Sequence, residues 1–325
     1  MHFPSMYRLV LPALLAIAAS AAFSQDAYPS RAVTVVVPFP PGGVADTAMR
    51  ALQPSLQRSL GQPVVITNRA GAGGAIGAAA VTQSKPDGYT LLVTFSTLAS
   101  LPEQAVVNRQ TPLFTLEQLQ PVARLTSDAT ALVVRNDSPY RGAAELLAAA
   151  KARPGQLTYA SSGTYGPSHL PAAMLADAAG VKLNHIPYTG GAQMITSLLA
   201  GTVDFAVFSR SLVLSHVEAG KLKYLASYGD ERWIRPPVPA SLNDIGLKVD
   251  YTSWIGAFAP AQTPPEVVQR LRQALRAATQ DAEFVEAFGK VGGGIAYLDG
   301  AEFQRYWQTE IQQSRDTIRK IGRIE

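Results

Sequence analysis

The chain has 325 residues, of which 47% are hydrophobic and 16% charged, and its formal net charge is +4. This composition suits a folded globule, and the scattered basic residues argue against nucleic-acid binding. The absence of cysteine excludes disulfides, thiol nucleophiles, cysteine-ligated metals and a lipid-modified cysteine.

The first residues predict a secretory signal. Arg8 precedes an almost wholly apolar run over residues 9–22, and small residues suited to cleavage follow at 22–24. The alternative is a membrane anchor, but a spanning helix needs about 20 apolar residues, which is longer than this run. We therefore expect residues 1–24 to be a signal peptide that is removed from an exported protein.

Beyond the signal, short apolar runs alternate with longer helical patterns. Residues 33–37 (VTVVV) predict a strand that is buried on both faces of a parallel sheet. Apolar residues spaced by four from Ala48 to Leu60 predict a helix that Gly61 ends. We expect further strands at 64–67, 89–94, 131–135, 157–160, 183–186, 203–208, 224–227 and 254–259, and helices at 46–60, 75–83, 143–152, 168–179, 192–200, 265–280 and 300–321.

This alternation is typical of parallel sheets built from βαβ units. The strands are too many for one comfortable sheet, and about 300 mature residues favour two domains over one. We therefore expect two α/β lobes, each a mainly parallel sheet with helices on both faces.

Two strand–loop–helix corners could bind an anion. The loop PFPPGGVAD over residues 38–46 carries two glycines and leads into a helix N-terminus, where backbone amides are free to donate. The segment 159–169 (YASSGTYGPSH) offers short hydroxyl donors from Ser161, Thr164 and Ser168. Each corner alone could be an ordinary capped turn. Together, in different lobes, they could close on one small carboxylate.

Other familiar sites lack their signatures. The glycine cluster at 71–77 has Ile76 where a dinucleotide fingerprint needs glycine, and no Lys-Ser/Thr pair follows it, so a turn with close helix packing is favoured. The histidines show no metal-ligand spacing, and no GxSxG elbow or convincing acid pair is present. We expect His169, inside the second corner, to be the one histidine that could touch a ligand, and no catalytic residue, metal site or cofactor.

A series of segments runs in order along nearly the whole mature chain: YPSRAVTVVVPFPPGGVADTAMR, GQPVVITNRAGAGGAIGAAAV, PGQLTYASSGTYGPSHL, HIPYTGGAQ, AGTVDFAVF and SWIGAFAPAQTPPEVV. The resemblance that these segments carry is to the Bug family, the TctC-like receptors of tripartite tricarboxylate transporters. It implies a periplasmic-binding-protein fold of type II-like topology, with the ligand cleft between two lobes. Lobe 1 would comprise residues 28–125 plus 253–325, and lobe 2 residues 126–252.

The resemblance also implies which positions line the cleft. In this family backbone amides, short hydroxyls and bridging waters hold the ligand carboxylates. The expected ligand-binding residues, with His169 added from the loop pattern, are Phe39, Gly43, Ala45, Asp46, Ser96, Thr97, Ser161, Gly163, Thr164, Ser168, His169, Tyr188, Gly190, Phe208 and Ser209.

Two positions depart from the family pattern. An Asp-Asn pair often follows the VDFAV strand, but Phe208 and Ser209 stand there, and Thr189 replaces the usual lysine of PYKG. We expect the missing acid to weaken any preference for a ligand ammonium group and to favour a less polar or aromatic carboxylate.

The implied function is a periplasmic receptor, working as a monomer, that binds a small organic carboxylate. The solute could be a di- or tricarboxylate, an amino acid or an aromatic acid, delivered to the membrane subunits of a tripartite tricarboxylate-type transporter. Two alternatives remain open: an orphan receptor that relays ligand binding to a sensor protein, and an exported enzyme, which lacks a recognisable site.

Overall fold

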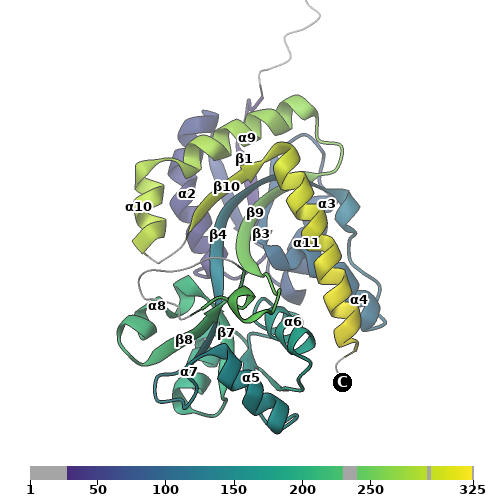
Figure 1. The fold of residues 1–325 in the computed structure, drawn as a ribbon. Helices are drawn as coiled ribbons and strands as arrows, with labels where there is room; N and C mark the ends of the chain where they lie inside the picture. The colour runs from purple at the N-terminus through teal and green to yellow at the C-terminus, as the bar shows by residue number, and fades with distance from the viewer. Residues whose placement is uncertain (1–27, 230–239, 291–293, 324–325) are drawn as a thin grey trace, which may run out of the picture.

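The computed structural model describes residues 28–229, 240–290 and 294–323, so the predicted signal peptide lies outside the described residues. The chain forms two α/β lobes joined through long central strands (Figure 1). None of the helices in these ranges is both long enough and apolar enough to cross a bilayer.

Lobe 1 is built on a six-stranded mixed sheet. Its strands are β1 (Val33–Val37), β2 (Val64–Asn68), β3 (Thr90–Phe95), β4 (Leu119–Arg135), β9 (Thr252–Pro260) and β10 (Ile295–Asp299). The order is β2-β1-β3-β9-β4, and β10 pairs with the free edge of β4. The β-branched run of β1 lies between β2 and β3, where helices cover both faces of the sheet and every second valine reaches the same cluster.

Lobe 2 shares β4 with lobe 1. Its other strands are β5 (Thr158–Ser161), β6 (Asn184–Pro187), β7 (Phe205–Ser209) and β8 (Leu222–Ser227). Strands β5, β6 and β7 are parallel, whereas β7 and β8 pair with β4 in antiparallel fashion.

Both sheets are mixed because β4 passes through both. The parallel pairs predicted from the βαβ pattern are present among β1–β3 and among β5–β7. The antiparallel pairs arise where β4 crosses between the lobes and β9 returns beside it, from Asp128 opposite Ser253 to Leu119 opposite Pro260.

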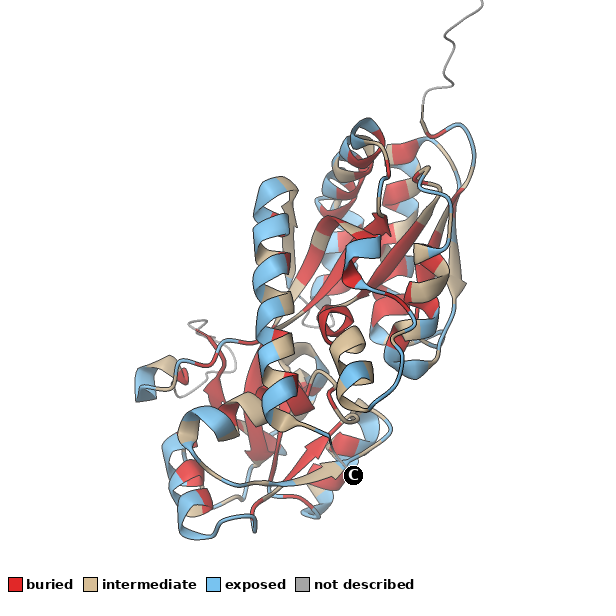
Figure 2. Cartoon of the chain, turned by 90° about the vertical axis from the view of Figure 1, so that its right-hand side faces the viewer, coloured by how far each residue is buried: buried red, intermediate tan, exposed pale blue. Residues whose placement is uncertain are grey.

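Helices cover both faces of each sheet (Figures 1 and 2). In lobe 1, α2, α9 and α10 pack on one face and α3 and α11 on the other; in lobe 2, α5 and α6 pack on one face and α7 and α8 on the other. Their bounds are α2 (Val44–Leu60), α3 (Ala75–Thr82), α4 (Leu101–Val107), α5 (Ala143–Ala152), α6 (His169–Ala179), α7 (Gly191–Ala200), α8 (Arg210–Glu218), α9 (Pro265–Thr279), α10 (Ala282–Lys290) and α11 (Gly300–Ile321).

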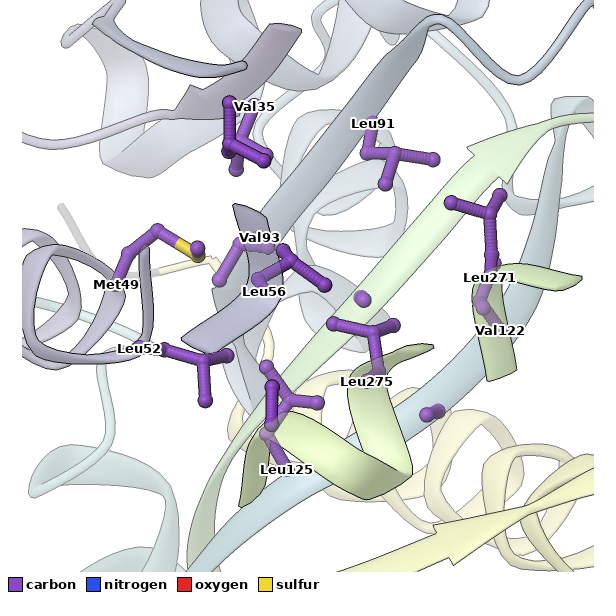
Figure 3. Close-up of a cluster of buried hydrophobic side chains, with 14 of the residues drawn as sticks. Val35, Met49, Leu52, Leu56, Leu91, Val93, Val122, Leu125, Leu271 and Leu275 are labelled. Carbon is purple, nitrogen blue, oxygen red and sulfur yellow. The ribbon is translucent and has the colours of Figure 1, made fainter. Parts of the chain in front are cut away.

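The core of lobe 1 lies between the sheet and the pair α2 and α9. Met49, Leu52 and Leu56 recur on one face of α2 and meet Leu271 and Leu275 of α9 over the strands (Figure 3). Each of these side chains is at most 1% exposed. This packing fixes where α2 begins, and therefore where its first amides lie.

Helix α11 contacts both lobes. Phe303 and Trp307 near its start pack with Trp254 in a lobe 1 cluster. Ile318 in its last turn is fully buried in the main cluster of lobe 2. The helix therefore runs along the side of the molecule from one lobe to the other (Figure 2).

Candidate functional site

Strand directions bring the predicted loops to one place. Strand β4 runs from lobe 1 into lobe 2, and β3 and β1 run the same way because β9 is antiparallel to both β3 and β4. Strand β7 runs back toward lobe 1, as do its parallel partners β5 and β6. The carboxyl ends of the two sheets therefore face each other across the lobe junction, which is where open α/β sheets bind ligands.

The lobe 1 corner is the N-terminus of α2. Gly43 is the N-cap, with extended backbone and no side-chain capping bond. The amides of Val44, Ala45 and Asp46 have no acceptor within the described ranges. A 17-residue helix that presents free amides is a favourable site for a carboxylate. Phe39 lies beside this corner with its ring 4.9 Å from that of Phe95.

Asp46 holds this loop in place. Its carboxylate accepts from the Gly42 amide at 2.8 Å, from Arg50 Nε at 2.8 Å and from Asn68 Nδ2 at 2.9 Å. The bond from Arg50, with help from Gly42 and Asn68, lowers the pKa of Asp46 to about 2. Since its side chain is 1% exposed and both oxygens are bonded, Asp46 shapes the corner with its carboxylate turned toward the loop.

Ser96 and Thr97 follow β3 at the same edge of lobe 1, in the short 3-10 helix Ser96–Ser100. Both are buried. The Ser96 hydroxyl has no hydrogen-bond partner of normal geometry within the described part of the chain, although the Tyr251 phenol lies nearby. A buried hydroxyl in this state can still bond a solute or a water.

The lobe 2 corner is a loop braced by its own side chains. Ser161 Oγ lies 2.6 Å from His185 Nε2, and Ser168 Oγ accepts from the Ser162 amide at 2.8 Å. Thr164 is only partly buried, and its hydroxyl has no partner among the residues described. The loop thus combines a fixed frame with donors that remain free.

His169 forms part of the frame. Its Nδ1 accepts from the Tyr165 amide at 2.9 Å, and its ring stacks 4.1 Å from that of His185. Burial, assisted by the neighbouring His185, lowers the pKa of His169 to about 3, and burial also lowers the pKa of His185. Both rings are therefore neutral near pH 7 and brace the loop without contributing charge.

The remaining predicted residues lie at the ends of β6 and β7. Tyr188 is partly buried, with its hydroxyl 2.5 Å from Ser197 Oγ, and Gly190 precedes α7. Ser209 is the N-cap of α8. Phe208 is 2% exposed, and its side chain lies in the hydrophobic cluster that includes Met194 and Val213, because alternate residues of β7 point to opposite faces.

Several residues at this junction were not anticipated from sequence. Asn68 ends β2 and bonds both Asp46 and the Phe39 carbonyl. Asp128 on β4 accepts from the amide and hydroxyl of Ser211, at the start of α8. An acid therefore stands close to the position where the family pattern often has one, but it comes from a different strand. Asn68 is the polar residue that ends the run VVITN, which is a signal in the sequence that could have found it.

A cavity of about 860 Å³ lies away from this junction. It is lined by α6, by the segment 243–250, by the last turns of α11 and by Tyr159. His169 lines this cavity and also accepts from the Tyr165 amide in the loop of the lobe 2 corner. Of the predicted ligand-binding residues, His169 alone is among those that line this cavity.

Comparison with known proteins identifies the family. Residues 48–323 match the model of the tripartite tricarboxylate transporter family receptor, TctC. The chain is 34% identical to the protein BugT of Bordetella pertussis over 304 residues, which are 93% of each chain.

Solved structures agree with this match. A TctC solute-binding protein from Polaromonas, without ligand, superposes with a TM-score of 0.78 at 32% identity, covering 90% of this chain and 99% of that one. MatC from Rhodopseudomonas palustris with bound malate gives a TM-score of 0.72 at 28% identity, covering 89% and 99%. A second R. palustris protein, with adipate, gives 0.75 at 27% identity, covering 89% and 97%. The chain therefore belongs to the TctC, or Bug, family of tripartite tricarboxylate transporter receptors, which are solute-binding proteins.

Proposed function

We propose that this receptor captures a small organic carboxylate between its two donor-rich corners and delivers it to membrane subunits of a tripartite tricarboxylate-type transporter. The observation that supports the proposal is the facing arrangement of the two sheets, because the free amides of α2 and the loop that contains Thr164 both follow strand ends that point to the lobe junction. The carboxylates bound by two relatives, malate and adipate, support this chemical class.

Binding would be linked to closure of the lobes. A solute that touches both corners binds the closed arrangement better than the open one, and it therefore shifts the population toward closure. The boundary between the lobes would lie where the chain crosses between them, near residues 125–126 and 252–253. The protein would act in the periplasm after loss of residues 1–24.

The solute is expected to carry an apolar portion. Phe208 offers no acid to an ammonium group, and the carboxylate of Asp128 already accepts from the amide and hydroxyl of Ser211. Val44, 53% exposed beside the lobe 1 corner, and Leu212, 38% exposed in the first turn of α8, add apolar surface near the junction. Dicarboxylates with a methylene chain and aromatic acids fit this setting better than amino acids.

A thermal-shift screen of the mature protein tests the proposal. The panel should hold di- and tricarboxylates, acidic amino acids, nicotinate and benzene carboxylates, with sugars and cations as controls. A ligand at roughly 100 times its dissociation constant adds about 2.7 kcal/mol of stability, which is a clear shift. If sugars or cations raise the melting temperature and no acid does, the proposed carboxylate site is wrong. Uptake of the solute by vesicles that contain the membrane subunits would separate transport from sensing.

A Thr164→Val variant localises the site. Removing one free hydroxyl should weaken binding of the best acid by about three- to tenfold, because one hydrogen bond contributes roughly 1 kcal/mol. The unfolding midpoint should stay the same, since Thr164 bonds no described residue. Thr309→Val is the matched control on exposed α11, where the hydroxyl bonds only the Arg305 carbonyl. Unchanged affinity in Thr164→Val would remove Thr164 from the site.

A further inference from the structure

The cavity lined by α6, by the segment 243–250 and by the last turns of α11 has the size of a ligand site. Its volume is about 860 Å³, and pockets for small molecules usually measure roughly 300–1,000 Å³. Helix α6 and the end of α11 lie side by side there (Figure 1), joined by the bond from Lys320 Nζ to Asp177 Oδ2 at 2.6 Å. The proposed carboxylate function uses none of the lining residues except His169.

Two buried polar groups in the wall of this cavity lack a protein partner. Tyr159 of β5 and His169 of α6 both line the cavity, although they are only 4% and 2% exposed. Within the described part of the chain, neither the Tyr159 hydroxyl nor His169 Nε2 makes a hydrogen bond. Buried polar groups are normally bonded, so an unbonded pair in a cavity wall needs an explanation. A molecule inside the cavity would supply the missing partner.

Both groups can donate a hydrogen bond. Because His169 Nδ1 accepts from the Tyr165 amide, the proton of the neutral ring is on Nε2. Burial lowers the pKa of His169 to about 3, so the ring is neutral near pH 7. Burial also raises the pKa of Tyr159, which keeps its hydroxyl protonated. The two rings are nearly parallel, with centroids 6.2 Å apart. The wall therefore offers two neutral donors that carry no charge to attract an ion.

The charged residues of the lining do not favour an anion either. Lys248 and Lys320 line the cavity together with Asp177, Asp250 and Asp316, so the acids outnumber the lysines by one. Lys320 already pairs with Asp177. The apolar lining residues include Ala173, Met174, Leu183, Val249 and Ile321. An uncharged acceptor on an apolar body therefore fits this wall better than a carboxylate does.

We propose that this cavity is a second binding site, for an uncharged and mainly apolar molecule that presents a carbonyl oxygen to Tyr159 Oη and His169 Nε2. The oxygen of a ketone, an ester or an amide accepts from these donors, and the apolar body packs against side chains such as Met174 and Leu183. The inference does not depend on the proposed carboxylate function, because His169 is the only residue that the two sites share.

Fluorine NMR of small aromatic probes tests the proposal on the whole mature protein. The first probe is para-fluoroacetophenone, which has one ketone oxygen. Its matched control is para-fluoro-α-methylstyrene, which has the same shape but a methylene group in place of that oxygen. The third probe is para-fluorobenzoate, which carries a negative charge. Line broadening on titration with protein measures the affinity of each.

Two variants and their controls localise the binding. Tyr159→Phe keeps the ring and removes only the unbonded hydroxyl. Its control is Tyr140→Phe, which removes a hydroxyl that pairs with Arg153 on the surface of lobe 2. Ala173→Phe places a ring in the cavity, because Ala173 is among the lining residues. Its control is Ala148→Phe, at an exposed position of α5 that does not line the cavity.

We expect para-fluoroacetophenone to bind the wild type with a dissociation constant on the order of 1 mM, as suits so small a molecule. The methylene control should bind at least about fivefold more weakly, because it leaves the donors without an acceptor. Tyr159→Phe should weaken binding of the ketone about three- to tenfold without lowering the unfolding midpoint of the free protein. Ala173→Phe should abolish binding, and both control variants should match the wild type.

Several results would overturn the proposal. One is the absence of ketone binding to the wild type, and another is equal affinity for the ketone and its methylene control. Unchanged binding in Ala173→Phe would show that the probe binds elsewhere. A lower unfolding midpoint in Tyr159→Phe would show that the hydroxyl has a partner within the protein. Tighter binding of para-fluorobenzoate that Ala173→Phe abolishes would show that the site prefers an anion. None of these results bears on the carboxylate screen, which tests the proposed function by itself.

Discussion

At the residue scale, the carboxylate of Asp46 connects three donors that come from the β1–α2 loop, from α2 and from β2. An asparagine side chain has only one oxygen that can accept hydrogen bonds from these donors. It also lacks the negative charge that strengthens the bonds from Arg50 and Asn68. The loop should then hold its free amides less firmly, although none of the donors to the solute has been removed.

We expect Asp46→Asn to lower the free energy of unfolding by about 1–3 kcal/mol, the usual contribution of hydrogen bonds to a charged group, and to weaken solute binding. Urea unfolding and titration calorimetry measure the two effects. Asp87→Asn is the control, because Asp87 pairs with Arg31 at the surface, where ion pairs contribute little. Equal losses in both variants would contradict a special role for Asp46.

A second residue-scale prediction concerns pH. Glu310 on α11 accepts from Trp254 Nε1 at 3.1 Å, and burial raises its pKa from 4.5 to about 7. The folded chain therefore binds a proton here that the unfolded chain has released between about pH 4.5 and 7. This contribution to stability is complete below pH 4.5 and is lost as the pH rises through 7.

Glu310→Gln should remove that dependence. The difference in unfolding free energy between wild type and variant should change by on the order of 2 kcal/mol between pH 4.5 and 8, with the wild type losing stability as the pH rises. Urea unfolding at four pH values in this range provides the measurement. Parallel pH profiles for the two proteins would mean that Glu310 titrates normally.

At the scale of elements, the sequence was most informative where one face is regularly apolar. The helical patterns of α2 and α11 predict their extents, and the valine run of β1 predicts a strand that is buried on both faces of the sheet. Helix α8 was not predicted because it follows β7 without a glycine or proline between them. The first half of β4 was not predicted because Arg124 and Asp128 interrupt its apolar pattern. Helix α10 and strand β10 are short and carry weak patterns.

For the site, strand–loop–helix corners and the family resemblance predict the loops but not the bonds within them. The Tyr165 hydroxyl donates to the Gly322 carbonyl across 157 positions, and no periodicity in the chain relates the two residues. Likewise, the side of β7 to which Phe208 points depends on strand register, since a shift of one residue would turn the ring toward the opposite face.

The glycine cluster provides a test at this scale. A Cβ at Gly77 would lie 2.6 Å from the Pro38 Cβ and 2.8 Å from the Arg69 carbonyl, which confirms the expected close packing of α3. Gly77→Ala should therefore cost about 1–3 kcal/mol and disturb the adjoining β1–α2 loop. Gly289→Ala on α10, where a Cβ meets nothing within 4 Å, is the matched control and should be neutral or stabilising. Similar melting temperatures for the two variants would argue against this packing.

At the scale of the whole molecule, the net charge of the full chain, +4 with Arg8 of the predicted signal included, should favour encounter with anionic solutes. Stopped-flow association rates should fall about two- to fivefold between roughly 20 and 200 mM salt, with little change in dissociation. A neutral amide analogue of the best acid is the control. A flat salt dependence for the acid would show that the field near the junction is not positive.

The continuous strand β4 has a consequence for how this receptor can diverge. Its ladder with β9 shifts register at two places, between Pro121 and Ala123 and between Arg124 and Thr126, and its ladder with β8 shifts between Leu132 and Val133. Irregularities of this kind bend and twist a strand, so the local shape of β4 contributes to the resting angle between the lobes. Substitutions at these places could change the affinity of related receptors for the same solute, although every residue that contacts the solute is unchanged.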